Sequence, residues 1–177
     1  MPPVISVVGK SGSGKTTLIE KLIPELKKRG YRVGVVKHAL HGFNFDIKGK
    51  DSWRHKEAGA DAVMVASAGK IAMVKENPCD ALDCLQPYFQ DVDLVITEGY
   101  KKEDKPKIEV IRKSRSSESV CGQNDHLIAI VTDTNITVNI PKFNFEDAES
   151  LADLIEKNFL KNEIMPSESI RVIKKIN

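Results

Sequence analysis

The segment from residue 9 to residue 16 constrains the fold of this chain more than any other feature. It fits the pattern G-x-x-x-x-G-K-[ST] at every defined position and reads Gly9, Lys10, Ser11, Gly12, Ser13, Gly14, Lys15 and Thr16. An apolar run at residues 4–8 precedes it, and apolar residues recur at helical spacing after it. A strand, a glycine-rich turn and a helix in this order form a loop whose backbone N–H groups bind phosphate. The segment therefore predicts a phosphate-binding loop in an α/β domain.

Each residue type in this loop has a chemical reason to be there. The glycines let the backbone curl so that successive N–H groups point at phosphate oxygens. We expect Lys15 to reach the β- and γ-phosphates and the hydroxyl of Thr16 to ligate Mg²⁺. Thr17 is expected to help hold the α-phosphate. The residue types therefore predict a site for a nucleotide with Mg²⁺.

Expected strands alternate with expected helices along most of the chain. Apolar runs predict strands at residues 4–8, 31–37, 62–66, 71–74, 92–97, 108–111 and 127–131. Helical spacing predicts helices from residue 16 to residue 29 and at residues 51–58, 79–89 and 145–159. Two of the strands flank Gly69 and suggest a hairpin. The alternation predicts an α/β fold of the three-layer P-loop NTPase type, with a mainly parallel central sheet and one inserted hairpin.

Length and composition narrow the class of protein. The 177 residues suit one domain, so we expect a P-loop nucleotide-binding domain over residues 1–160. Residues 161–177 are expected to be a C-terminal tail or an edge element of the same domain. A formal net charge of +2 argues against a nucleic-acid-binding protein. No apolar run approaches the roughly 18 residues of a membrane span, so we expect no contact with a membrane.

The cysteines indicate a reducing compartment. Cys79, Cys84 and Cys121 are an odd and sparse set, which favours a cytoplasmic protein with free thiols. Cys79 and Cys84 fall within the expected helix at residues 79–89, and their spacing does not match a zinc site. We therefore expect both to be ordinary core or surface thiols.

A nucleotide site also needs carboxylates near its metal ion, and these are expected just beyond the carboxyl ends of parallel strands. Glu98 follows the expected strand at residues 92–97, and Gly99 after it would let the backbone approach a phosphate. Asp46 lies in the polar loop that follows the strand at residues 31–37. A solvated strand end and an ordinary loop acid are the alternative interpretations of Glu98 and Asp46. Asp93 is expected at the opposite end of the sheet.

Two further runs of residues resemble a known family. The first begins at Lys37 and contains His38, His41, Phe43, Asp46, Gly49, Lys50, Asp51, Ser52, Arg54, Ala58, Gly59 and Ala60. The second contains Glu98, Gly99, Tyr100, Lys101, Pro106, Lys107, Ile108, Glu109, Val110 and Arg112. Together with the phosphate-binding loop they resemble the signatures of the molybdopterin-guanine dinucleotide biosynthesis protein B (MobB) family over residues 4–133.

The resemblance implies a cytoplasmic GTP-binding protein with weak GTPase activity that forms homodimers. It implies an accessory role to the molybdenum cofactor guanylyltransferase, the enzyme that joins a guanosine nucleotide to molybdopterin. Carried over by residue, the phosphate-binding loop would bind GTP, and Thr16, Asp46 and Glu98 would surround Mg²⁺. Lys15, Asp46 and Glu98 would then be the catalytic set. Basic residues would be available for a second anionic ligand such as molybdopterin, or for a partner: Lys37, His38, Lys50, Arg54, Lys101 and Arg112.

The choice of base leaves an alternative open. The chain has no Asn-Lys-x-Asp guanine signature, and the nearest equivalent is Thr132 with Asp133 after the strand at residues 127–131. The Asp133 carboxylate could accept from guanine N1–H and N2–H₂, a pairing that adenine cannot make.

A small-molecule kinase or ATP-dependent ligase of the dethiobiotin-synthetase-like type fits the loop and Glu98 equally well. In that interpretation, the basic stretch at residues 112–125 would be a mobile lid.

Overall fold

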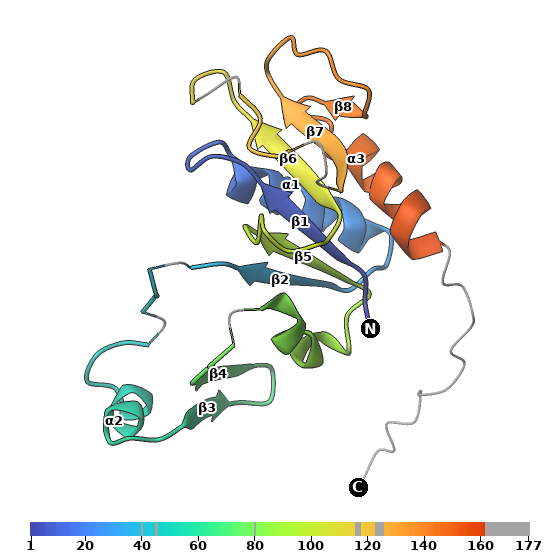
Figure 1. Cartoon of the computed structure of the whole chain (residues 1–177). Coiled ribbons are helices and arrows are strands. Elements are labelled where there is room, and N and C mark those ends of the chain that lie inside the picture. The colour runs from blue at the N-terminus through green and yellow to red at the C-terminus, as the bar shows by residue number, and fades with distance from the viewer. Residues whose placement is uncertain (40, 45, 80, 116–117, 123–125, 162–177) are drawn as a thin grey trace, which may run out of the picture. The chain divides into compact units, whose positions relative to one another are not determined.

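The computed structural model describes residues 1–39, 41–44, 46–79, 81–115, 118–122 and 126–161 (Figure 1). The chain divides into two compact units. One unit comprises Met1–Lys37 and the chain from Phe89 onward, and the other comprises His38–Tyr88. Of the expected C-terminal tail, residues 162–177 lie outside the described part of the chain.

A six-stranded parallel sheet forms the centre of the first unit. Its order is β2-β5-β1-β6-β7-β8, and every pairing is parallel (Figure 1). The strands span Val4–Val8 (β1), Val33–Lys37 (β2), Leu94–Glu98 (β5), Lys107–Ile111 (β6), Leu127–Thr132 (β7) and Lys142–Phe143 (β8). The α/β class and the parallel central sheet are therefore confirmed. The sequence did not predict β8, because two residues are too few to give a strand pattern.

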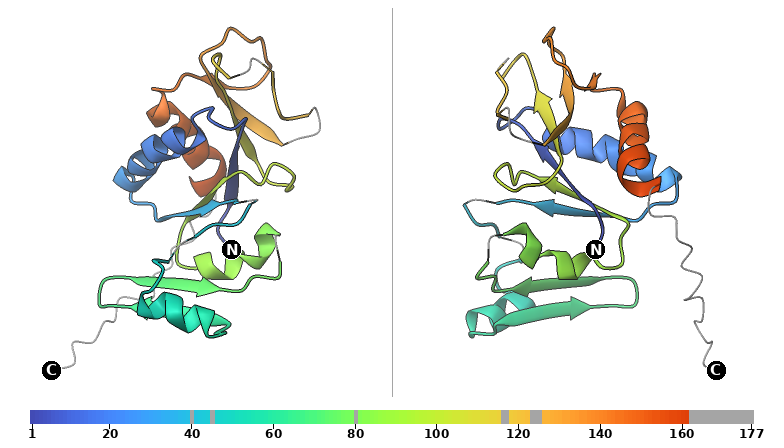
Figure 2. Two further views of the ribbon diagram at one scale, coloured as in Figure 1. Left: turned by 90° about the vertical axis from the view of Figure 1, so that its left-hand side faces the viewer. Right: turned by 45° about the vertical axis from the view of Figure 1, so that its right-hand side comes forward.

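Helices α1 (Lys15–Lys28) and α3 (Ala148–Ile155) pack on the same face of this sheet (Figure 2). Each helix buries one apolar stripe, which for α1 consists of Leu18, Ile19, Leu22 and Leu26. These side chains form one core with strand residues such as Ile5, Ile96 and Ile108. Since the last two residues of the phosphate-binding loop, Lys15 and Thr16, form the start of α1, this packing fixes the loop at the carboxyl end of β1.

Helix α3 begins three residues later than the predicted helix at residues 145–159. The backbone N–H of Asn144 donates to Asp147 Oδ2 over 2.9 Å, and the backbone N–H of Glu146 donates to Asn144 Oδ1 over 2.7 Å. These side-chain acceptors hold residues 144–147 in a turn instead of a helix. The α3 helix continues as a π-helical turn over Glu156–Leu160.

The second unit contains the predicted hairpin. Strands β3 (Ala62–Ala66) and β4 (Ile71–Lys75) are antiparallel and form a separate two-stranded sheet, with Met64 opposite Met73. Helix α2 spans Asp51–Glu57, close to the expected 51–58. The hairpin and this helix are therefore confirmed as sequence predictions.

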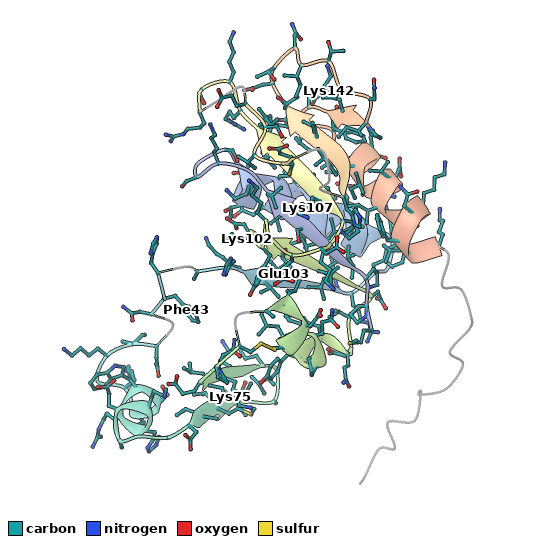
Figure 3. All side chains as sticks on the ribbon, viewed as in Figure 1. Phe43, Lys75, Lys102, Glu103, Lys107 and Lys142 are labelled. Atoms are coloured by element: carbon teal, nitrogen blue, oxygen red, sulfur yellow. A yellow bond between two sulfur atoms is a disulfide. The ribbon has the colours of Figure 1, made fainter. Side chains whose placement is uncertain are left out.

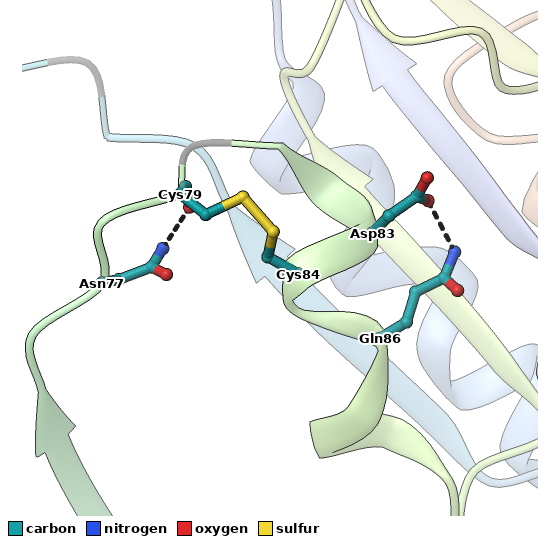
Figure 4. The surroundings of a disulfide bond; sticks show 5 residues. All are labelled: Asn77, Cys79, Asp83, Cys84 and Gln86. Atoms are coloured by element: carbon teal, nitrogen blue, oxygen red, sulfur yellow. Dashed lines mark hydrogen bonds between the residues drawn. A yellow bond between two sulfur atoms is a disulfide. The ribbon is translucent and has the colours of Figure 1, made fainter.

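The predicted helix at residues 79–89 is wrong. Two short 3₁₀ helices, Leu82–Cys84 and Gln86–Phe89, replace it. Pro87 explains part of the difference, because it has no backbone N–H and restricts the residue before it. The other part is a disulfide between Cys79 and Cys84, which corrects the expectation of two free thiols (Figure 4). Disulfides are rare in cytosolic proteins, so this bond departs from the reduced state that the composition suggested.

No helix in the described ranges is both long enough and apolar enough to cross a membrane.

Candidate nucleotide-binding site

The loop between β1 and α1 has the curled backbone that phosphate binding requires. Gly9, Gly12 and Gly14 have φ values of 146°, 71° and 98°, which side chains other than glycine rarely adopt. A Cβ atom at Gly9 would collide with the carbonyl oxygen of Val110 and lie 2.9 Å from Ser13 Oγ. The three glycines therefore allow a conformation and a close packing that alanine would not.

Lys15 extends back over this loop from the first turn of α1. Its ammonium group donates to the carbonyl oxygens of Gly9 over 3.0 Å and Lys10 over 2.9 Å. Partial burial lowers the pKa of Lys15, the nearby carboxylate of Glu98 opposes this shift, and Lys37 adds to it. The ammonium group thus lies inside the loop, where the motif predicts the β- and γ-phosphates.

Thr16 and Glu98 meet at the carboxyl edge of the sheet. The Thr16 hydroxyl donates to Glu98 Oε2 over 2.9 Å, and Lys37 Nζ lies 3.9 Å from Glu98 Oε1. Glu98 ends β5, the strand beside β1, and its side chain is 15% exposed. A hydroxyl and a carboxylate at this separation are hard oxygen donors of the kind that Mg²⁺ takes. The structure therefore brings together two of the three predicted metal ligands.

Asp46, the third predicted ligand, belongs to the second unit. Its Oδ1 atom accepts from the backbone N–H of Ile47 over 2.8 Å and from the Ser52 hydroxyl over 3.0 Å. These bonds close a turn before α2. In the described ranges no group of three or more His, Cys, Asp or Glu side chains is placed to hold a metal ion. A metal-binding or catalytic role for Asp46 stays a prediction.

Hydrogen bonds from the Gly99 backbone and from the Lys107 side chain hold the residues that follow Glu98. The N–H of Gly99, whose φ is 104°, donates to the carbonyl oxygen of Val7 over 3.0 Å. Lys107 lies on β6 and is only 2% exposed (Figure 3). Its ammonium group donates to the carbonyl oxygens of Glu103 over 2.8 Å and Lys105 over 3.3 Å. Lys107 therefore orders the loop before β6 from inside.

Asp133 directly follows β7 and anchors the turn after β6. Its Oδ1 atom accepts from the backbone N–H of Lys113 over 2.7 Å. Reading of a guanine base by this carboxylate stays a prediction. Asp93, by contrast, precedes β5 and accepts from the backbone N–H of Arg32 over 2.6 Å. Asp93 therefore lies at the opposite end of the strand from Glu98, as the sequence predicted.

The sequence did not predict the role of Phe145 beside the loop. Its ring stacks on the guanidinium group of Arg112, with 4.0 Å between the guanidinium carbon and the ring centroid. A Cβ atom at Gly14 would lie 3.2 Å from Arg112 and 3.4 Å from Phe145. The apolar spacing indicates only a helix at Phe145, and no sequence pattern indicates that its ring would meet a residue 33 positions earlier.

Comparison with known proteins adds the family context. The family model "Molybdopterin guanine dinucleotide synthesis protein B" matches residues 4–133. A "Molybdopterin-guanine dinucleotide biosynthesis adapter protein" of Haemophilus influenzae is 38% identical over 157 residues, covering 87% of this chain and 88% of the relative. The protein of the same name from Escherichia coli is 36% identical over 163 residues, covering 88% and 92%.

Solved structures of MobB proteins are similar to this chain in fold and in sequence. The crystal structure of molybdopterin-guanine biosynthesis protein B matches with a TM-score of 0.72 and 34% identity, covering 87% of this chain and 98% of that one. The structure of Bacillus subtilis MobB matches with a TM-score of 0.69 and 27% identity, covering 88% and 96%.

Proposed function

Because the chain belongs to the molybdopterin guanine dinucleotide synthesis protein B family, we propose that it is a GTP-binding accessory protein of molybdenum cofactor biosynthesis. The contact between Thr16 and Glu98, beside the ammonium group of Lys15, carries the proposal. It combines the phosphate-binding groups and the metal-binding oxygens that a nucleotide with Mg²⁺ requires. The nucleotide-binding domain is proposed to span residues 1–160, with His38–Tyr88 as an inserted unit.

GTP is proposed as the nucleotide on two grounds. The names of the relatives refer to a guanine dinucleotide. Asp133 follows β7 and has a second carboxylate oxygen besides the one that accepts from Lys113. A carboxylate there would accept from guanine N1–H and N2–H₂, whereas adenine presents no such pair of donors. Other contacts of the nucleotide would come from the loop backbone, Thr17 and Gly99.

Slow hydrolysis of GTP to GDP and phosphate is the activity proposed for this site. Lys15 would neutralise charge on the β- and γ-phosphates, while Thr16, Asp46 and Glu98 would hold Mg²⁺. Mg²⁺, when bound, would supply positive charge that offsets the negative charge of the phosphates. The side chains of the protein hold and orient the phosphates and the ion.

The proposed partner is the molybdenum cofactor guanylyltransferase, and the proposed assembly is a homodimer. The word "adapter" in the names of the relatives supports a role in complex with another enzyme. Exposed basic side chains, among them Lys37, Lys50 and Lys101, would suit molybdopterin as a second, anionic ligand. A cytoplasmic location is proposed from the same resemblance.

Replacement of Glu98 by Gln tests the proposed metal role. Glu98→Gln keeps the side-chain size and an acceptor for Thr16 but removes the negative charge. We expect GTP affinity to change little, and Mg²⁺-dependent GTP hydrolysis to fall by at least about ten-fold. The matched control Glu103→Gln changes a carboxylate of the loop that follows, outside the site. Unchanged hydrolysis in Glu98→Gln would show that the metal is held elsewhere.

The same assay separates the accessory protein from a small-molecule kinase. An accessory GTPase hydrolyses GTP slowly whether or not an acceptor is present, whereas the rate of nucleotide turnover by a kinase rises when its acceptor metabolite is added. Acceptor-dependent turnover in a metabolite screen would therefore contradict the proposed function.

A further inference from the structure

The turn formed by Arg112, Lys113, Ser114 and Arg115 lies against the phosphate-binding loop. The backbone N–H of Arg115 donates to the carbonyl oxygen of Arg112 over 2.9 Å, which closes the turn. The backbone N–H of Lys113 donates to Asp133 Oδ1 over 2.7 Å, which ties the turn to the end of β7. The turn is therefore fixed by the sheet that also positions the loop.

Arg112, the first residue of the turn, packs between Phe145 and Gly14. Its guanidinium group stacks on Phe145, and its Nε atom is buried without a hydrogen-bond partner among the described residues. The same group lies beside Gly14, where a Cβ atom would be 3.2 Å away. Arg112 thus packs as a spacer between Phe145 and the second half of the loop.

Arg115 covers the first half of the loop. Its side chain is exposed, and its Nε, Cζ and Nη2 atoms would lie 2.9, 3.1 and 3.1 Å from a Cβ atom at Gly12. Gly12 is the middle of the loop, two residues after Lys10, whose carbonyl oxygen accepts from the Lys15 ammonium group. The carboxylates of Glu118 and Asp133 pair with other groups, Glu118 with the Lys10 ammonium group over 3.5 Å and Asp133 with the backbone N–H of Lys113.

We propose that Arg115 contacts the terminal phosphate of a bound nucleoside triphosphate and makes the site prefer a triphosphate over a diphosphate. The inference rests on the proposed nucleotide site. Lys15 reaches the phosphates from the helix, and Arg115 reaches them across Gly12, where the missing side chain leaves room. A guanidinium group offers paired N–H donors that match two phosphate oxygens. A turn anchored at Asp133 would hold this group near the phosphates without a partner protein.

Binding of two guanine nucleotides to Arg115→Ala tests the proposal. The full-length protein is titrated calorimetrically, in the presence of Mg²⁺, with a non-hydrolysable GTP analogue and separately with GDP. We expect the affinity for the analogue to fall by about ten-fold, and the affinity for GDP to change by less than about three-fold. An equal fall for both nucleotides, or no fall for either, would overturn the proposal.

Two further variants sharpen the result. Arg115→Lys keeps the charge but loses the paired donors, so part of the preference for the triphosphate analogue should return. Lys113→Ala removes a neighbouring exposed cation of the same turn but keeps the backbone N–H that donates to Asp133. The affinities for the GTP analogue and for GDP should both stay at the wild-type values. A fall in analogue affinity in Lys113→Ala as large as that in Arg115→Ala would show that local charge, and not Arg115, sets the preference.

The wild-type titration separates this inference from the proposed function. If wild-type protein binds neither nucleotide, the proposed GTP-binding function fails. If wild-type protein binds both and the preference survives in Arg115→Ala, only the role of Arg115 fails.

Discussion

Gly9 shows how one residue can decide whether the phosphate-binding loop forms. Its φ of 146° is strained for a residue with a side chain, and a Cβ atom would collide with the carbonyl oxygen of Val110 on β6. Gly30, after α1, also has a positive φ, of 91°, but a Cβ atom there would meet nothing within 4 Å. A side chain at Gly30 would therefore meet backbone strain alone, whereas a side chain at Gly9 would meet both strain and a steric clash.

Replacement of Gly9 by Ala should abolish GTP binding in a protein that still folds. The new methyl group forces the loop away from β6, and the N–H groups no longer converge on the phosphates. Calorimetry with GTP and Mg²⁺ measures the loss, and circular dichroism verifies the fold. Gly30→Ala should lower the free energy of unfolding by about 1–2 kcal/mol and leave GTP affinity intact. Wild-type affinity in Gly9→Ala would contradict this view of the loop.

At the scale of elements, a charged cluster joins α1 to the end of α3. Arg29 lies 3.0 Å from Glu156 and 2.7 Å from Asp153, and the Tyr31 hydroxyl donates to Glu156 over 3.0 Å. The Tyr31 hydroxyl, with Lys161 and Arg29, lowers the pKa of Glu156 below its ordinary value. The ionised form of Glu156 is therefore favoured by folding.

Replacement of Glu156 by Gln should lower the melting temperature at pH 7. A carboxyl group whose pKa is lowered in the folded state stabilises the protein above its unfolded pKa of about 4.3, and this stabilisation is lost as the pH falls through the lowered folded value. Thermal melts between pH 7 and pH 3 should show the difference from wild type shrinking below about pH 4.3. The control Glu149→Gln, in α3, should melt at the wild-type temperature at pH 7. A difference that grows on acidification would contradict the pairing.

The same scale shows what the sequence could and could not predict. The loop, Lys15, Thr16 and Glu98 were predictable because a contiguous motif and a strand end specify their places in a parallel sheet. The contact of Arg112 with Phe145 was not, because it depends on how the segments after β6 and β8 pack together. Apolar spacing predicts the helix at residues 79–89, and that spacing carries no information about the bond between Cys79 and Cys84.

At the scale of the whole molecule, the hairpin of the second unit exposes apolar side chains. Met64 is 56% exposed, Ile71 is 68% exposed and Met73 is 37% exposed, and the strand pairing places these three side chains on one face of the hairpin. Contiguous exposed apolar surface often marks a protein interface. This surface supports the proposed homodimer.

Replacement of Met64 by Asp should convert the proposed dimer to a monomer. A buried carboxylate at an apolar interface has no compensating partner, so association weakens. Light scattering after gel filtration should give twice 19.7 kDa for wild type and 19.7 kDa for the variant. Val138→Asp, at an exposed apolar position of the first unit, should stay dimeric. A monomeric wild type, or a dimeric Met64→Asp, would contradict the assignment of the interface.

Direct titration of the protein with GTP and with ATP, each with Mg²⁺, tests the central claim that the Gly9–Thr16 loop binds a guanine nucleotide. We predict that GTP binds at least about ten-fold more tightly than ATP, and that Lys15→Ala loses at least about ten-fold in GTP affinity. Lys28→Ala, at the far end of α1, should bind GTP as wild type does. Tighter binding of ATP, or wild-type GTP affinity in Lys15→Ala, would contradict the claim.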